Sequence, residues 1–129
     1  MSLAELAALR DAAPPRGAQV QSDAGYGSMR GLEMVEAPEG ILFLRDGALA
    51  VVHVPDPSLS PDELARFTAG DVPRLRSRAG KHAWVHVRAD EGLAVTEEDG
   101  RVRFAEVFPP TTFEDYRERI HTPPPKFVE

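Results

Sequence analysis

The stretch that decides the fold is ILFLRDGALAVVHV, residues 41–54, in which two apolar runs flank Asp46-Gly47. A type I′ turn needs positive φ at both central positions, and an Asp-Gly pair tolerates this conformation. The stretch therefore predicts an antiparallel hairpin. Its expected cross-strand pairs are Arg45 with Ala48, Leu44 with Leu49 and Leu42 with Val51. Both faces of this hairpin are apolar, which predicts a central position in a sheet that is covered on both sides.

Further strands are expected on both sides of this hairpin. Residues 32–37 (LEMVEA) precede it and predict a neighbouring strand. Residues 82–88, 92–98 and 101–108 (HAWVHVR, GLAVTEE and RVRFAEVF) predict a three-stranded meander that contains a second Asp-Gly turn. Residues 14–31 are polar and rich in glycine, so we expect a loop there.

Three N-terminal capping signals predict helices: Ser2 with Glu5, Ser60 before Pro61, and Thr111 with Glu114. The last helix would present an apolar stripe of Phe113, Tyr116 and Ile120. Residues 71–80 (DVPRLRSRAG) predict either another short helix or an extended connection.

These elements predict one α+β domain with a five- or six-stranded, mainly antiparallel sheet and two to four helices packed on it. Along the chain we expect an N-terminal helix over residues 1–13, a loop over 14–31, the sheet and helices over 32–120, and an extended proline-rich tail over 121–129.

The composition excludes several classes of protein. The chain has 129 residues, of which 42% are hydrophobic, and this content suffices for one core. It has no cysteine, which excludes disulfides, thiolate metal clusters and a cysteine nucleophile. The N-terminus lacks the basic start and apolar run of a secretory signal, and no segment has the roughly eighteen apolar residues of a membrane span. We therefore expect a soluble, cytoplasmic protein without a membrane contact.

The protein is acidic, with a net charge of −6, but one segment is basic. Residues 71–88 carry five cations against the single acidic residue Asp71, a local charge of +4 that leaves −10 on the remainder. A phosphate backbone would be repelled by most of the surface, so nucleic acid is an unlikely partner, although a local anion-binding patch is compatible with the sequence.

His82 and His86 are four residues apart, a spacing that suits one metal ion on a helix. The flanking valines and the alternating pattern instead predict a strand, on which the two imidazoles would be roughly 13 Å apart. We therefore expect no metal site, and no motif in the chain indicates a cofactor.

The same strand would place its polar and aromatic side chains on one face of the meander, beside the basic segment. Eight residues form this predicted binding surface: His82, Trp84, His86, Arg88, Arg74, Arg76, Arg78 and Lys81. An aromatic ring among titratable side chains is typical of a surface that binds a partner, so the favoured function is a non-enzymatic binding or regulatory module with a protein partner. The competing structural explanation is that the last helix or the tail, pinned by Phe127, covers Trp84.

A different class of function rests on His53 and Glu106, each expected among apolar side chains. The Asp99-Gly100 turn predicts that Leu93 pairs with Glu106 and Val95 with Phe104 on the core face. On the polar face the expected pairs are Thr96 with Arg103 and Glu98 with Arg101. A buried carboxylate must be paired or protonated, so a cleft that contains His53 and Glu106 would indicate a small enzyme or ligand-binding domain. A deep pocket at these residues would favour this alternative, and a flat surface around Trp84 would favour the binding module.

Overall fold

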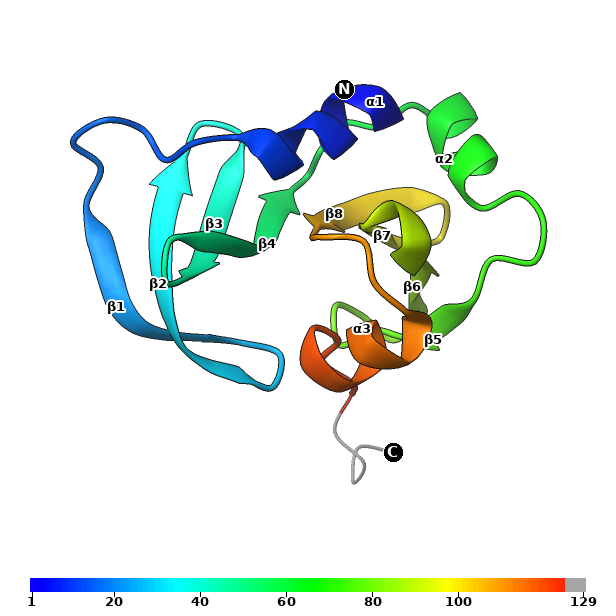
Figure 1. Cartoon of the computed structure of the whole chain (residues 1–129). Helices are drawn as coiled ribbons and strands as arrows, with labels where there is room; N and C mark the ends of the chain where they lie inside the picture. Colours follow the sequence, from blue (N-terminus) through cyan, green and yellow to red (C-terminus); the bar gives the residue numbers. More distant parts are fainter. Residues whose placement is uncertain (125–129) are drawn as a thin grey trace.

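Residues 1–124 are described by the computed structural model of this protein, and eight strands of this segment form one antiparallel sheet (Figure 1). In their order across the sheet the strands are β1 (Val20–Tyr26), β2 (Met29–Ala37), β3 (Gly40–Arg45), β4 (Ala48–Pro55), β8 (Arg101–Val107), β7 (Leu93–Glu98), β6 (Ala83–Arg88) and β5 (Arg74–Arg76). The α+β class and the antiparallel arrangement are confirmed, but the sheet has eight strands rather than five or six.

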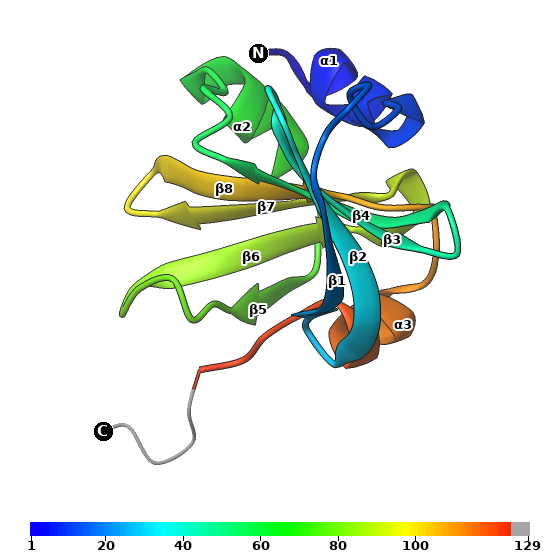
Figure 2. The same ribbon diagram turned by 90° about the vertical axis from the view of Figure 1, so that its left-hand side faces the viewer.

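Helices cover both faces of this sheet. The α-helices are α1 (Leu3–Ala8), α2 (Pro61–Phe67) and α3 (Phe113–Arg119), with short 3₁₀ turns at η1 (Leu9–Asp11) and η2 (Ala89–Glu91). Figure 2 shows α1 and α2 on one side of the sheet and α3 on the other. The capping signals at Ser2 and Ser60 are confirmed. The third cap lies one residue later than expected, because the hydroxyl of Thr112 accepts from the Asp115 amide.

The two unexpected strands are the two edges of the sheet. Residues 14–31 were expected to be a loop, yet they contain β1 and the start of β2. Residues 74–76 form β5, so the extended alternative is correct for the basic segment and the short helix is wrong. Edge strands have one unpaired side and need little apolar burial, and Val20 of β1 is 53% exposed. Such strands lack the apolar runs by which the other six were predicted.

Both Asp-Gly turns have the expected conformation, with φ of 51° and 81° at Asp46-Gly47 and 52° and 81° at Asp99-Gly100. The pairs Arg45 with Ala48 and Leu44 with Leu49 are confirmed. Beyond them a bulge at Ala50 shifts the register by one residue. Leu42 therefore pairs with Val52 instead of Val51.

A second bulge, at Arg103 in β8, changes which residues share a face with Glu106. Glu98 pairs with Arg101 as expected, but Thr96 pairs with Phe104 and Ala94 pairs with Glu106. The expected pairs of Leu93 with Glu106, Val95 with Phe104 and Thr96 with Arg103 are wrong, because the extra residue moves the rest of β8 by one position.

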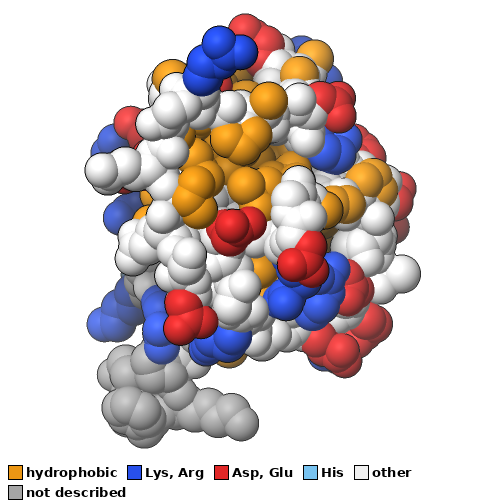
Figure 3. Space-filling view, turned by 60° about the vertical axis from the view of Figure 1, so that its left-hand side comes forward, with side chains coloured by type: hydrophobic (Ala, Val, Ile, Leu, Met, Phe, Trp, Pro, Cys, Tyr) orange, Lys and Arg blue, Asp and Glu red, His pale blue; other side chains and the backbone are white. Residues whose placement is uncertain are grey.

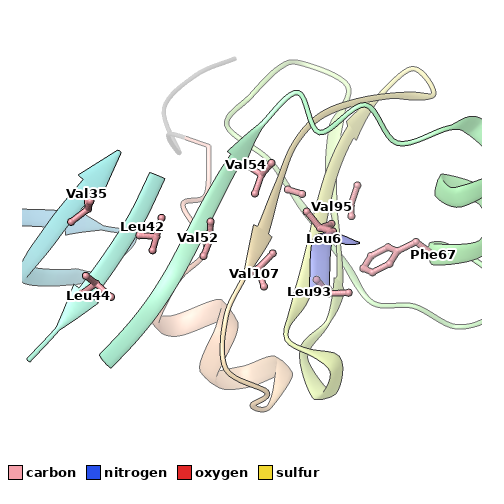
Figure 4. Close-up of a cluster of buried hydrophobic side chains, with 11 residues drawn as sticks. Leu6, Val35, Leu42, Leu44, Val52, Val54, Phe67, Leu93, Val95 and Val107 are labelled. Carbon is pink, nitrogen blue, oxygen red and sulfur yellow. The ribbon is translucent and has the colours of Figure 1, made fainter. Parts of the chain in front are cut away.

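Two apolar cores result from this arrangement. Figure 4 shows the first, in which Leu6 of α1 and Phe67 of α2 pack with valine and leucine side chains of the central strands. The second core lies under α3, where Tyr116 and Ile120 are both 1% exposed. Two residues of the predicted apolar stripe, Tyr116 and Ile120, are therefore buried against the sheet, and the third, Phe113, is half-buried.

One side of the protein carries an apolar patch. On the side turned forward in Figure 3, which carries the β1 end of the sheet, hydrophobic side chains gather in one patch bordered by charged groups. None of the helices within residues 1–124 has the length and apolar character that crossing a membrane requires.

The predicted contact of Phe127 and most of the proline-rich tail lie outside the described residues.

Candidate functional site

A cavity of about 380 Å³ opens on the α3 side of the sheet. Its wall combines aromatic, polar and titratable side chains from β1, β4, β7, β8 and α3. The six that carry its chemistry are Tyr26, His53, Thr96, Phe104, Glu106 and Tyr116. The cavity therefore contains both residues of the predicted cleft, His53 and Glu106.

Glu106 is the buried centre of this site. The bulge in β8 turns its side chain toward α3, and the residue is only 4% exposed. Its two carboxylate oxygens accept hydrogen bonds from the Tyr26 and Tyr116 hydroxyls, each over 2.5 Å. No salt bridge to a cation reaches it within residues 1–124. Burial raises the pKa of Glu106 from its ordinary 4.5 to about 7, although both tyrosine hydrogen bonds act to lower it.

Tyr116 reaches Glu106 from α3. The ring is 1% exposed and packs against Phe108, with the ring centroids 5.3 Å apart. The helix begins at its Thr112 cap and ends at Arg119, so Tyr116 lies in its middle turn and faces the sheet. Burial, together with the neighbouring Glu106 carboxylate, raises the pKa of Tyr116 well above its ordinary value of 10.

Tyr26 approaches Glu106 from the end of β1, where a tight turn leads into β2. Gly27 in this turn has a φ of 57°, and a Cβ atom there would lie 2.3 Å from the Arg119 carbonyl oxygen. The Ser28 amide donates to the same carbonyl oxygen over 3.0 Å. Only glycine permits this close approach, which fixes the β1–β2 turn on the end of α3 and brings both tyrosines to Glu106.

His53 lies beside Glu106, because the two residues are paired across β4 and β8. Its Nδ1 atom is 3.0 Å from the Tyr26 hydroxyl, and its ring packs on Phe104 at a centroid distance of 4.8 Å. Burial lowers the pKa of His53 below its ordinary value of 6.5. Tyr26 therefore joins His53 to Glu106 by two consecutive hydrogen bonds.

Thr96 contributes an unsatisfied hydroxyl to the cavity. The residue is 1% exposed, and its Oγ1 is the one buried side-chain nitrogen or oxygen atom within residues 1–124 that lacks a hydrogen bond. An unpaired buried polar group costs about 1–3 kcal/mol. A polar atom of a bound molecule would remove this cost if small movements of the neighbouring side chains opened the hydroxyl, which is closed to solvent in this structure.

The predicted binding surface around Trp84 has a different environment from the one expected. Trp84 is half-buried, and the guanidinium carbons of Arg74 and Arg76 lie 4.1 and 5.3 Å from its ring centroid. Arg76 also donates to the Lys81 carbonyl oxygen over 2.8 Å. The two arginines thus occupy the ring surface that a partner would use.

Other members of that surface have structural contacts. His86 is 8% exposed and lies 3.1 Å from the Glu97 carboxylate. Arg88 donates to the Phe67 and Ala69 carbonyl oxygens, which fixes the end of α2 to the sheet. His82 and Lys81 are exposed, and Arg78 lies at the cavity instead. The eight residues therefore do not form one continuous exposed face.

Three residues of the site were missed at the level of sequence: Tyr26, Thr96 and Tyr116. Tyr26 fell in the expected loop, and Thr96 was expected on a solvated face, onto which the β8 bulge instead brings Phe104 and Glu106. Tyr116 was correctly expected to be buried, but apolar periodicity does not show where its hydroxyl points. The signal that could have been used is chemical: a buried glutamate without a cation requires hydrogen-bond donors, and tyrosines are suitable ones.

The comparisons with known proteins give no relative. The chain matches no protein-family model, no curated protein and no solved structure.

Proposed function

We propose that this protein binds a small molecule in the cavity under α3, and that Glu106 acts on this molecule as an acid–base group. The observation that carries the proposal is the position of Glu106. It is a buried carboxyl held by two tyrosines and placed at the wall of a cavity, beside His53. This arrangement supports a small enzyme or ligand-binding domain.

A purely structural role explains Glu106 poorly. An isolated buried carboxylate is costly unless it is paired, and its two hydrogen-bond donors here are neutral hydroxyls. A glutamine at the same position could accept from one tyrosine and donate to the other without that cost. A carboxyl with a pKa of about 7 is instead suited to give and take protons near neutral pH.

The lining of the cavity restricts the kind of molecule. Its volume of about 380 Å³ lies within the range of small-molecule sites. Phe104 and Val85 supply apolar surface, and Thr96 Oγ1 supplies a free hydroxyl. Arg78 lines the same cavity and carries a positive charge. These groups suit a small molecule with an apolar body and a carbonyl, hydroxyl or carboxylate oxygen.

The protein-binding module centred on Trp84 has less support. Its aromatic ring is half-buried under Arg74 and Arg76, and His86 is buried beside Glu97. The cavity supplies the feature that separates the two functions, since a pocket at His53 and Glu106 favours the ligand site.

The proposal is tested by a ligand-observed NMR screen of small aromatic fragments that carry a carbonyl, hydroxyl or carboxylate group. Fragments that bind are measured again with Thr96→Val, which replaces the unpaired hydroxyl with a methyl group of similar size. One lost hydrogen bond of about 1 kcal/mol corresponds to roughly fivefold weaker binding. His82→Ala, at an exposed position away from the cavity, is the matched control and should leave the affinity unchanged.

A screen without a single binder would contradict the proposal. Binders whose affinity is the same for the wild-type protein, Thr96→Val and a cavity-filling Val85→Phe variant would also contradict it, because those fragments would bind elsewhere.

A further inference from the structure

Glu106, Tyr26 and His53 form a continuous chain of hydrogen bonds. Glu106 Oε2 is 2.5 Å from the Tyr26 hydroxyl oxygen, which is 3.0 Å from His53 Nδ1. From this geometry we infer that the three side chains form a proton relay, which carries one proton between the buried carboxyl and His53 Nε2 at the cavity. The inference rests on the proposed function for its substrate, but the relay is a property of the free protein.

The outer end of the relay is accessible. His53 lines the cavity, and its Nε2 atom makes no hydrogen bond within residues 1–124. Among these residues, the one buried side-chain nitrogen or oxygen that lacks a hydrogen bond is Thr96 Oγ1. His53 Nε2 also lacks a hydrogen bond, so it cannot be buried and is open to solvent or to a ligand. A bound molecule can therefore exchange a proton with His53 Nε2.

With Glu106 ionised, every group in the chain has a partner. Tyr116 donates to Oε1 of Glu106, Tyr26 donates to Oε2, and His53 donates from Nδ1–H to the Tyr26 oxygen. In this arrangement the imidazole is neutral, and its Nε2 carries a lone pair that can accept a proton.

With Glu106 protonated, the same three side chains again satisfy one another. Glu106 Oε2–H donates to Tyr26, Tyr26 donates to His53 Nδ1, and His53 carries its proton on Nε2. The two arrangements differ by one proton. A proton that arrives at Nε2 displaces the Nδ1 proton to the Tyr26 oxygen, and the Tyr26 proton moves to Glu106.

The proton moves through Tyr26 rather than through Tyr116 because, among the described residues, only Tyr26 has a second hydrogen-bond partner. If Glu106 donated to the Tyr116 oxygen, the Tyr116 hydrogen would need another acceptor, and within residues 1–124 it has none. The Tyr26 oxygen has His53 Nδ1 as this acceptor. Tyr116 therefore remains a donor to Oε1 in both arrangements and acts as a positioning residue.

The relay gives the cavity a base that can take up a proton without becoming an imidazolium ion. Because burial disfavours a charged His53, transfer of the proton to Glu106 leaves both side chains neutral. This suits a substrate with a weakly acidic proton, on an oxygen, a nitrogen or a carbon next to a carbonyl, whose oxygen bonds to Thr96. The other titratable groups that line this cavity are Tyr116, His121 and Arg78.

The test is the tautomer of His53, measured by imidazole ¹⁵N NMR of the full chain from about pH 5 to pH 9. The His53 signals are identified by their loss in His53→Gln. We expect Nδ1–H at high pH and Nε2–H at lower pH, with the change centred at about pH 7, where Glu106 takes up its proton. Glu106→Gln should hold His53 as Nε2–H at every pH, because its amide donates to Tyr26 as the protonated acid does.

Two tyrosine variants separate the relay from a general effect of pH. Tyr26→Phe should abolish the tautomer change, whereas Tyr116→Phe should keep it and move its midpoint to higher pH, because Glu106 loses a donor. A single His53 tautomer throughout the pH range, or a change that persists in Tyr26→Phe or Glu106→Gln, would overturn the relay. Fragment binding at Thr96 is measured separately, so failure of the relay and failure of the ligand site are distinguishable.

Discussion

Replacement of Glu106 with glutamine should change how the stability of the protein depends on pH. Burial raises the pKa of Glu106 from 4.5 to about 7 in the folded protein, so the folded state holds this proton more tightly than the unfolded chain does. The resulting stabilisation is complete below about pH 4.5 and is lost as the pH rises through about 7. One pKa unit corresponds to about 1.4 kcal/mol, so the loss reaches about 3 kcal/mol above about pH 8.

Glutamine preserves the shape of the side chain and can bond to both tyrosines, but it does not titrate. The free energy of unfolding of Glu106→Gln, minus that of the wild-type protein, should therefore rise by about 3 kcal/mol between about pH 4.5 and about pH 8.5. Burial lowers the pKa values of His53 and His121, which makes the folded protein less stable at low pH. Both histidines remain in the variant, so their contributions largely cancel in the difference.

The assay is urea unfolding at about pH 4.5, 6.5 and 8.5, followed by the fluorescence of Trp84, the only tryptophan. Glu118→Gln, at an exposed position on α3, is the matched control and should show no comparable rise. A difference between Glu106→Gln and the wild-type protein that stays constant with pH would refute the reasoning, because Glu106 would then ionise as easily in the folded protein as in the unfolded chain.

Three further predictions concern single sites. Thr96→Val should raise the free energy of unfolding by about 1–3 kcal/mol, because it removes an unpaired buried hydroxyl; a loss of stability in urea unfolding would indicate that this hydroxyl is already bonded. Trp84→Ala should lower the midpoint of thermal unfolding and cost about 1–2 kcal/mol, less than a fully buried aromatic, because the ring is half-buried. Calorimetric titration with zinc should show no tight site at His82 and His86, and a stoichiometric site lost in either alanine variant would contradict the strand.

The central strands could be predicted because their signals are local. At Asp46-Gly47 and Asp99-Gly100 the turn conformation follows from two residues, and the apolar runs beside them are buried in the sheet. The caps at Ser2 and Ser60 are equally local. In each case the chemistry of a few neighbouring residues decides the structure.

The candidate site could be predicted only in part, because it depends on long-range features. His53 and Glu106 were recognised as titratable groups among apolar neighbours, but the contact between them needs the pairing of β4 with β8. A bulge of one residue at Arg103 has no clear sequence signal, yet it brings Phe104 and Glu106 to the face of Thr96, where the three line the cavity. Tyr26 comes from a polar edge strand that is held by the end of α3, a contact between residues far apart in the chain.

The central claim is that the cavity holds a small molecule, and a crystal structure of the protein with its tightest-binding fragment tests it most directly. We expect electron density for the fragment between Phe104 and Glu106, with an oxygen atom within hydrogen-bond distance of Thr96 Oγ1. Density for the fragment at another part of the surface, with Thr96 Oγ1 still unpaired beside an empty cavity, would contradict the account.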